Sequence, residues 1–150
     1  MNVLSLMSRD VATCRVNETL ADAADQMRAR DIGALPVLDD TGRVVGMITD
    51  RDICMTALVR EEPLRAIPVA AAMSAAVITC DCDDDVGIAE AQMADHQLRR
   101  IPVVDDQGYP IGIVSLNDLA RAIAQRAEVS TGEVMATLAA VCAPRSPVAA

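Results

Sequence analysis

Residues 46–52 read GMITDRD, and residues 112–118 repeat the pattern as GIVSLND. In the first stretch, Thr49 follows a short apolar run that starts with glycine, and Asp52 lies three residues further on. This pattern is typical of a strand that feeds a helix, with the hydroxyl as N-cap and the acid in the first turn. It also fits a second interpretation, in which the hydroxyl and the acid hold a small polar ligand.

The two stretches belong to a longer internal duplication. A shift of 66 residues, from 46 to 112, aligns residues 7–53 with residues 73–119 without a gap. The shift places MSRDVATC over MSAAVITC and ALPVLDDTG over RIPVVDDQG. An ungapped match of this length indicates a duplication, so the repeats decide the architecture.

Each repeat predicts the element order β-α-β-β-α. A short extended piece (residues 11–14 or 77–80) precedes Thr19 or Asp84, the candidates for the N-cap of the first helix. The helix is followed by the strand ALPVL or RIPVV, a short Asp-Asp-x-Gly loop and a return strand that ends at the hydroxyl residue. The first helix of repeat 1 has an apolar face of Leu20, Ala23, Ala24 and Met27.

The expected fold class is α/β (α+β), with two tandem repeats packed with pseudo-two-fold symmetry. Neither repeat is large enough to bury its own apolar faces, so we expect the two to pack on each other. The spacing of Ser130 and Glu133 predicts a capping box at the start of one further helix. The expected segments are repeat 1 (residues 1–58), a charged linker (59–68), repeat 2 (69–128), a C-terminal helix (129–142) and a disordered tail (143–150).

Composition argues against several functions. The net charge is −9 and the chain has no lysine, which disfavours binding to nucleic acid because phosphate contacts need clustered basic residues. There is no Phe or Trp and only one Tyr, so bases find no aromatic surface on which to stack. No apolar run approaches the ~18 residues of a membrane span, and the first residues do not resemble a signal peptide. We therefore expect a cytoplasmic protein that binds neither nucleic acid nor membrane.

The cysteines and the single histidine give no catalytic or metal-binding set. With His96 as the single histidine, no Ser-His-Asp or Cys-His set is indicated, and a complete zinc site would need ligands from distant segments. We expect no enzyme activity, no metal and mostly reduced, buried thiols. A redox sensor is the alternative, because two of the cysteines occupy equivalent positions in the repeats. The cysteines are Cys14, Cys54, Cys80, Cys82 and Cys142.

The paired motifs resemble those of the cystathionine-β-synthase (CBS) domain family. Both copies match its G-h-h-(S/T)-x-x-D signature, where h is apolar, and LPVLDDTG and IPVVDDQG precede them. The similarity covers residues 7–125 and resembles a stand-alone pair of CBS domains, a Bateman module. The resemblance implies a regulatory, signal-transducing protein that binds an adenosine nucleotide in the cleft between the repeats. AMP is the ligand we expect, with ADP, ATP or S-adenosylmethionine as alternatives, and no cofactor is required.

The chemistry of the motif fits a ribose phosphate. A helix N-terminus offers free N–H groups and a positive dipole end to a phosphate, and a hydroxyl at the cap can donate to it. An acid one turn into the helix lies on the same side and accepts from the two ribose hydroxyls. The simpler alternative is that the hydroxyls and acids only cap their helices.

The resemblance implies two sites of unequal strength. Arg99 and Arg100 precede the strand in repeat 2, where repeat 1 has Gly33 and Ala34, and arginine is a strong phosphate ligand. The alternative for the arginine pair is a solvated surface position. The main site would combine Arg99, Arg100, Ser115 and Asp118 with Met7, Ala12 and Ile32. The weaker site would combine Thr49 and Asp52 with Met73, Ile78 and Leu98.

The helices after Thr49 and Ser115 carry apolar residues that one chain does not fully cover. CBS pairs associate through such helices, so the resemblance implies a two-fold homodimer. The protein that responds to the ligand is unknown from the sequence. A structural dimer without any ligand is a further alternative.

Overall fold

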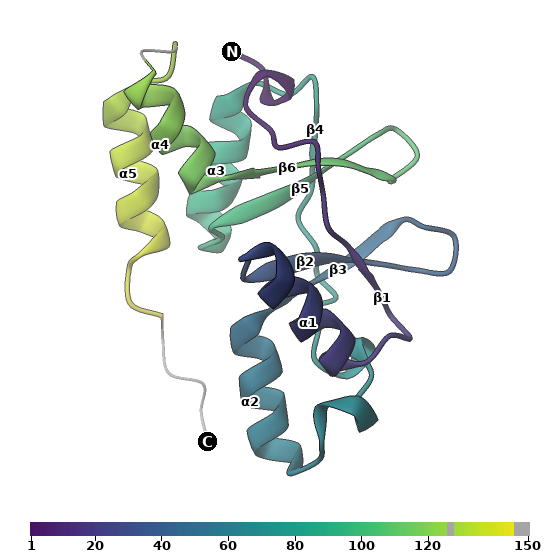
Figure 1. The fold of residues 1–150 in the computed structure, drawn as a ribbon. Coiled ribbons are helices and arrows are strands. Elements are labelled where there is room, and N and C mark those ends of the chain that lie inside the picture. Colours follow the sequence, from purple (N-terminus) through teal and green to yellow (C-terminus); the bar gives the residue numbers. More distant parts are fainter. Residues whose placement is uncertain (126–127, 146–150) are drawn as a thin grey trace. The chain divides into compact units, whose positions relative to one another are not determined.

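The computed structural model describes residues 1–125 and 128–145, which form two compact units (Figure 1). Unit 1 consists of Met1–Arg9, Ile78–Val103 and the described residues from Ile111 onward, and unit 2 consists of Asp10–Val77 and Val104–Pro110. Each unit has its own hydrophobic core. None of the helices in these residues has both the length and the apolar character that a membrane span requires.

Unit 2 carries the first repeat, and its element order confirms the prediction from the sequence. The strand β1 pairs in parallel with β2, and β2 pairs antiparallel with β3. Helices α1 and α2 pack on this sheet around a core that includes Leu20, Leu35, Ile48 and Ile53. The elements are β1 (Cys14–Arg15), α1 (Leu20–Arg30), β2 (Ala34–Leu38), β3 (Val44–Thr49) and α2 (Asp50–Arg60).

Unit 1 carries the second repeat in the same order, with a sheet of order β4-β5-β6. Its core includes Met93, Ile101, Val114 and Leu119, each without exposed surface. One further helix, α5 (Thr131–Val141), packs against α3 and α4 (Figure 1). The repeat elements are β4 (Cys80–Asp81), α3 (Val86–His96), β5 (Arg100–Val104), β6 (Pro110–Ser115) and α4 (Leu116–Ala124).

The first residues of each repeat pair with the last strand of the other repeat. In unit 1, Ser8 and Ile113 exchange backbone hydrogen bonds of 2.9 and 3.0 Å. In unit 2, Ser74 and Met47 do the same at 2.8 and 3.1 Å. This close approach explains the glycine of the motif, because a Cβ at Gly46 would lie 2.6 Å from the carbonyl oxygen of Ser74.

The loops between the paired strands also follow the prediction. Gly42 and Gly108 have φ of +88° and +87°, the left-handed region that favours glycine. The carboxylate of Asp39 accepts hydrogen bonds from the backbone N–H groups of Thr41 and Arg43, which closes the first loop. The Asp-Asp-x-Gly pattern is therefore confirmed as a tight hairpin loop.

One helix start differs from the prediction. Thr19 caps α1, as expected, but Asp85 rather than Asp84 caps α3, with its carboxylate accepting from the N–H of Gly87 at 2.9 Å. Asp84 instead turns back and accepts from the N–H of Asp81 at 2.9 Å. The prediction of Asp84 was wrong: two adjacent aspartates offer equivalent capping groups, and the shift of 66 residues places Thr19 over Asp85.

The segment expected as a linker, residues 59–68, forms part of unit 2. Helix α2 continues to Arg60, and a 3₁₀ turn spans Leu64–Ala66. Ile67 has no exposed surface, and its carbonyl oxygen accepts from the N–H of Leu20 at 2.9 Å. The charged composition of residues 59–68 predicted an exposed linker and did not indicate that the side chain of Ile67 is buried in the core.

The C-terminal region contains the expected helix with two differences. The Ser130 hydroxyl accepts from the N–H of Glu133 at 3.4 Å, but the reciprocal bond of a capping box is not formed. In the expected tail, Ala143 and Arg145 hydrogen-bond with Gln97 through a carbonyl oxygen and a guanidinium. Residues 146–150 lie outside the described residues, so the expectation of disorder is not tested there.

Candidate functional site

The junction between β6 and α4 holds the hydroxyl and the acid of the second repeat. Oδ2 of Asp118 accepts from the backbone N–H of Ser115 at 2.8 Å and from its hydroxyl at 2.5 Å. The Ser115 hydroxyl in turn accepts from the N–H of Asp118 at 3.3 Å, which completes a capping box. Oδ1 of Asp118 accepts from the guanidinium of Arg121. Both carboxylate oxygens of Asp118 therefore accept hydrogen bonds within the fold, and the residue is only 5% exposed.

The junction between β3 and α2 repeats the capping box with one difference. Oδ2 of Asp52 accepts from the N–H of Thr49 at 2.9 Å and from its hydroxyl at 2.7 Å. Met55 stands at the position equivalent to Arg121, so this acid has no neighbouring arginine one turn along the helix. Asp52 is half-buried, and its Oδ1 makes no hydrogen bond with any residue that the structure describes.

The arginine pair lies at the same end of unit 1 as Ser115. The carbonyl oxygen of Arg99 accepts from the N–H of Leu116 at 3.0 Å, which joins the start of β5 to the start of α4. Arg99 is exposed and Arg100 half-buried. Neither forms an ion pair within residues 1–125 and 128–145. The backbone of Arg99 thus lies beside the N-terminus of α4, and a helix N-terminus near unpaired arginines is a favourable setting for a phosphate.

Met7 and Met73, at the start of the two aligned repeats, each lie in the same unit as the hydroxyl residue of the site predicted for them. Met7 packs against Gly112 in unit 1, and Met73 packs against Gly46 in unit 2. Met7 therefore shares a unit with Ser115, and Met73 with Thr49.

The other predicted residues are divided between the units. Ala12 and Ile32 belong to the core region of unit 2, whereas Ile78 and Leu98 pack against the core of unit 1. Each of the two predicted sites thus draws residues from both units, and the full residue sets remain predictions.

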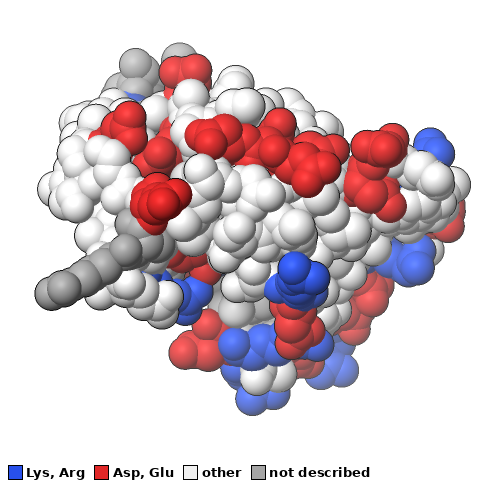
Figure 2. Space-filling model, turned by 90° about the horizontal axis from the view of Figure 1, so that it is seen from above, with Lys and Arg blue, Asp and Glu red and all other residues white. Residues whose placement is uncertain are grey.

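The charge on the surface limits which anions can approach. Figure 2 shows one face on which acidic side chains are widespread, while basic side chains gather in the lower part of the view. With a net charge of −9, a nucleotide with one phosphate meets less repulsion than one with three.

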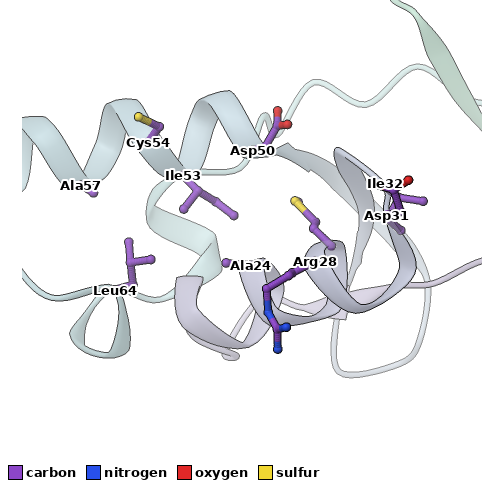
Figure 3. Close-up of a pocket in the computed structure, with 10 residues that line it drawn as sticks. Ala24, Arg28, Asp31, Ile32, Asp50, Ile53, Cys54, Ala57 and Leu64 are labelled. Carbon is purple, nitrogen blue, oxygen red and sulfur yellow. The ribbon is translucent and has the colours of Figure 1, made fainter.

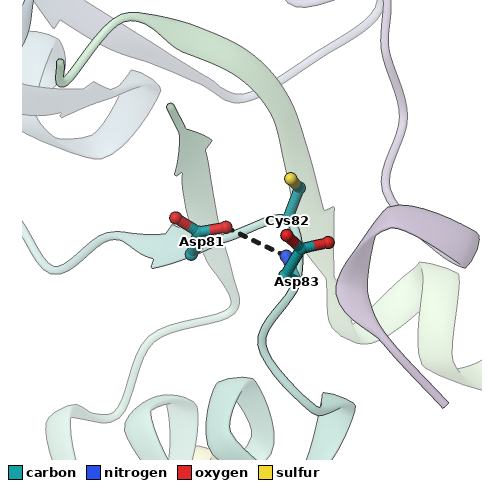
Figure 4. A group of neighbouring side chains, drawn as sticks. All are labelled: Asp81, Cys82 and Asp83. Atoms are coloured by element: carbon teal, nitrogen blue, oxygen red, sulfur yellow. Dashed lines mark hydrogen bonds between the residues drawn. The ribbon is translucent and has the colours of Figure 1, made fainter. Parts of the chain in front are cut away.

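Three consecutive side chains form a group that could hold a metal ion. One ligand atom from each of Asp81, Cys82 and Asp83 lies within 4.8 Å of the others (Figure 4). Burial, a hydrogen bond to Asp81 and the charge of Asp83 raise the pKa of the Cys82 thiol. In the sequence, the run DCDDD at residues 81–85 carries the signal for this group, which was not predicted as a metal site.

The two equivalent cysteines are poor candidates for redox chemistry. Cys14 and Cys80 are buried, with 1% and 3% of their surface exposed. Burial, with a smaller effect of Glu18, raises the pKa of Cys14 to about 12. Burial, with Asp84 and Asp81, raises the pKa of Cys80 to about 12. Because the thiolate is the reactive form, both thiols are held unreactive near neutral pH.

An open groove in unit 2 was not predicted from the sequence. It lies between α1 and α2 and has a volume of about 570 Å³. Figure 3 shows Ile53 and Leu64 pointing into the space between the helices. Charged groups stand at its edge, and the complete lining is Ala24, Met27, Arg28, Asp31, Ile32, Asp50, Ile53, Cys54, Ala57 and Leu64.

Comparison with known proteins identifies the repeats. A model of the CBS domain matches residues 3–58 and 61–125. The CBS domain-containing protein YhcV of Bacillus subtilis (strain 168) is 34% identical over 137 residues, which cover 91% of this chain and 94% of YhcV.

Solved structures have the same fold. The CBS domain pair of protein MJ0100, in complex with 5′-methylthioadenosine and S-adenosyl-L-methionine, superimposes with a TM-score of 0.75 at 28% identity, covering 84% of this chain and 98% of that one. Hypoxic Response Protein I, with two coordinated zinc ions, superimposes with a TM-score of 0.74 at 32% identity, covering 81% of this chain and 98% of that one. A protein of that name occurs in Mycobacterium tuberculosis.

Proposed function

Because the chain belongs to the CBS domain family, we propose that it is a regulatory module that binds an adenosine nucleotide. The observation that carries the proposal is the grouping of Arg99, Arg100 and the Ser115–Asp118 capping box at one end of unit 1. A helix N-terminus with a hydroxyl and two guanidinium groups is suited to a phosphate. The related pair in MJ0100 holds two adenosine derivatives, which supports this class of ligand.

The proposed ligand is AMP, with ADP, ATP and S-adenosylmethionine as the alternatives to test. The phosphate would lie at Ser115 with Arg100, and Asp118 would accept from the ribose hydroxyls. The adenine would contact aliphatic side chains such as Met7, because the chain has no Phe or Trp. The remaining members of the main site are Arg99, Ala12 and Ile32. Thr49, Asp52, Met73, Ile78 and Leu98 would form the weaker site.

The proposed role is signalling by a cytoplasmic homodimer, without catalysis. The ligand would act by changing how the protein contacts a target, which is to be identified. A ligand can shift such an equilibrium only through a difference in its affinity for the two states. The competing proposal of a thiol-based sensor loses support from Cys14 and Cys80, since their raised pKa values disfavour the thiolate.

Isothermal titration calorimetry tests the proposal directly. The full chain is titrated with AMP, ADP, ATP, adenosine, S-adenosylmethionine and 5′-methylthioadenosine at fixed ionic strength. We expect saturable binding, with AMP tighter than adenosine. Absence of binding by all six ligands at millimolar concentration would overturn the proposal and favour a structural dimer without ligand.

A further inference from the structure

Helix α5 is an addition to the two repeats, and it belongs to unit 1. The CBS domain model matches residues up to 125, before α5 begins at Thr131. The helix packs against α3 and α4, and its Val134 and Val141 join the core of unit 1 (Figure 1). In the first repeat, α2 is followed by two 3₁₀ turns rather than by a helix of this length. Helix α5 therefore covers a surface of the second repeat that has no equivalent cover in the first.

Polar contacts hold the C-terminal end of α5. Nε2 of Gln97, at the end of α3, donates to the carbonyl oxygens of Ala140 and Ala143 at 3.1 and 3.0 Å. The guanidinium of Arg145 donates to the carbonyl oxygen of Gln97 at 2.5 Å. Carbonyl groups at a helix end lack partners within the helix, so these bonds attach this end of α5 to α3.

The N-terminal end of α5 meets α3 at a group of acids. Glu133 lies in the first turn of α5, and Asp85 is the N-cap of α3. The charges of both act on Glu90, one turn into α3. One cation belongs to the same group, because the N-terminal ammonium of Met1 pairs with Asp85 at 3.2 Å. The two ends of α5 are thus held differently, by hydrogen bonds at one end and beside like charges at the other.

Glu90 is the buried member of this group. It is 6% exposed, and its Oε1 has no hydrogen-bond partner in the part of the chain that the structure describes. None of the ion pairs within residues 1–125 and 128–145 includes it. Burial, with the charges of Glu133 and Asp85, raises the pKa of Glu90. A buried carboxyl group without a partner is tolerated when it is protonated and destabilises its surroundings when it is ionised.

The first repeat shows that the fold does not require an acid at this position. The shift of 66 residues places Ala24 of α1 at the position of Glu90. Ala24 packs against the core of unit 2, so a small apolar side chain serves the repeat there. The acid therefore occurs in the repeat that carries the additional helix, where its ionisation acts on the contact between α3 and α5.

We propose that α5 is a proton-sensitive cover of unit 1, whose N-terminal half separates from α3 when Glu90 is ionised and packs on α3 when Glu90 is protonated. Gln97 keeps the C-terminal end attached in both states. Opening exposes Val134, one of the two side chains that α5 places in the core. The apolar surface that unit 1 offers to a partner thus changes with pH. This device is separate from the proposed nucleotide site and does not depend on the identity of the ligand.

Proton linkage fixes the direction of the pH dependence. In the open state the carboxyl group of Glu90 is hydrated and titrates near its ordinary pKa of 4.5, whereas the closed state holds the proton more tightly. The closed state is therefore favoured most below pH 4.5, and this advantage is lost as pH rises through the raised pKa. A difference of one between the two pKa values changes the opening equilibrium about tenfold.

Hydrogen exchange of backbone amides, followed by NMR on the full chain at pH 5 and pH 7.5, tests the inference. Protection is corrected for the intrinsic dependence of exchange on pH. For residues 134–137 it should fall by about tenfold or more from pH 5 to pH 7.5, because a local opening exposes their hydrogen bonds. For residues 139–142, near Gln97, the fall should be smaller. The amides of α1 serve as the internal control and should keep their protection.

Two variants connect the effect to Glu90. Glu90→Gln keeps the shape of the side chain without its charge and should give the same protection of residues 134–137 at both pH values. Asp95→Asn removes an exposed acid from the same helix and should retain the fall seen in the wild-type chain. If Glu90→Gln does not fold, as judged by circular dichroism, Glu133→Gln replaces it and should reduce the fall.

Several results would overturn the inference. Equal protection of α5 at both pH values in the wild-type chain would exclude the opening. A fall that persists in Glu90→Gln, that is unchanged in its substitute Glu133→Gln, or that disappears in Asp95→Asn would exclude Glu90 as its cause. A fall shared equally by α1 would show unfolding of the whole chain in place of a separate movement of α5.

Discussion

The guanidinium of Arg121 donates to Oδ1 of Asp118, one turn earlier on α4. Both oxygens of the acid that we assign to the ribose are therefore engaged within the protein. The first repeat has Met55 in place of the arginine, so the two repeats differ in the availability of the acid as well as in the arginine pair. Binding in the second repeat must compete with Arg121.

Replacing Arg121 by alanine should strengthen the binding of AMP. Arg121 is 66% exposed, so its ion pair is worth about 1 kcal/mol or less, and its removal should raise the affinity by about fivefold at most. Calorimetric titration of the variant measures this gain. Met55→Arg adds the same charge to the first repeat and should leave the affinity unchanged. A loss of affinity in Arg121→Ala would show instead that Arg121 itself contacts the nucleotide.

Asp118→Ala should reduce both binding and stability. The lost hydrogen bonds to a charged group correspond to about 1.5–3 kcal/mol of binding free energy. The lost capping box should lower the free energy of unfolding by about 0.5–2 kcal/mol. Calorimetry and urea unfolding measure the two effects separately.

The matched control for Asp118 is Asp22, which forms a capping box of the same kind with Thr19. Asp22→Ala should lower the stability and leave nucleotide affinity unchanged. If Asp118→Ala behaves in the same way, Asp118 acts only as a helix cap, and its assignment to the ribose is wrong.

Arg100→Ala should remove the preference for AMP over adenosine. A charge-assisted contact with a phosphate is worth roughly 1.5–3 kcal/mol, so the wild-type chain should bind AMP about tenfold or more tightly than adenosine. The variant should bind both with the affinity of adenosine. Thr49→Ala, in the weaker site, should change neither affinity nor stoichiometry. Two equal sites per chain would contradict the assigned role of the arginine pair.

Glu90→Gln should stabilise the protein near neutral pH. Glu90 of α3 is 6% exposed, and its Oε1 has no hydrogen-bond partner among the residues that the structure describes. Burial, with the charges of Glu133 and Asp85, raises its pKa above the ordinary value of 4.5. The folded state therefore favours the protonated form, and the destabilisation is absent at low pH and grows as pH rises through the raised pKa.

Thermal unfolding at pH 4 and pH 7.5 measures this effect. Glu90→Gln should raise the melting temperature at pH 7.5 and change it little at pH 4. Glu133→Gln removes one of the two acids that act on Glu90 and should give a smaller gain in the same direction. An equal shift at both pH values would exclude ionisation of Glu90 as the cause.

Alkylation should distinguish the buried thiols from the exposed ones. Cys54 and Cys142 are exposed and should react with iodoacetamide at pH 7.5 within minutes. Cys14 and Cys80 should react only after unfolding, because their thiolates are disfavoured. Mass spectrometry of peptides, with and without peroxide, identifies the modified positions. Rapid oxidation of Cys14 or Cys80 in the folded protein would revive the redox proposal.

The duplication made the element order predictable, but local sequence patterns could not show which distant segments pair with each other. Hydrophobic periodicity predicted α1 and its buried face, and the hydroxyl–acid spacing predicted the caps at Thr49 and Ser115. The pairing of Ser8 with Ile113 joins residues 105 positions apart, and no local pattern encodes such a contact. The burial of Ile67 depended in the same way on tertiary packing, which overrides a charged local composition.

The same limit applied to the candidate site. The sequence placed the hydroxyls, the acids and the arginines at element ends, and the structure brings Arg99 to the start of α4 through one backbone hydrogen bond. The engagement of Asp118 by Arg121 was accessible from their spacing of three residues on a helix, but spacing does not show whether a pair forms.

The pairing of each repeat's first residues with the last strand of the other repeat sets an order of events during synthesis. Residues 7 and 8 are synthesised early, yet their partner strand β6 is complete only when Ser115 has been added. At about 5–20 residues per second, these residues wait for several seconds without their pairing strand. Most of unit 2 can form in that interval, whereas unit 1 needs both the beginning and the end of the chain. Neither repeat, cut out at the repeat boundary, is therefore expected to fold unchanged. A protein fused to the N-terminus should disturb the folding of the second repeat more than that of the first.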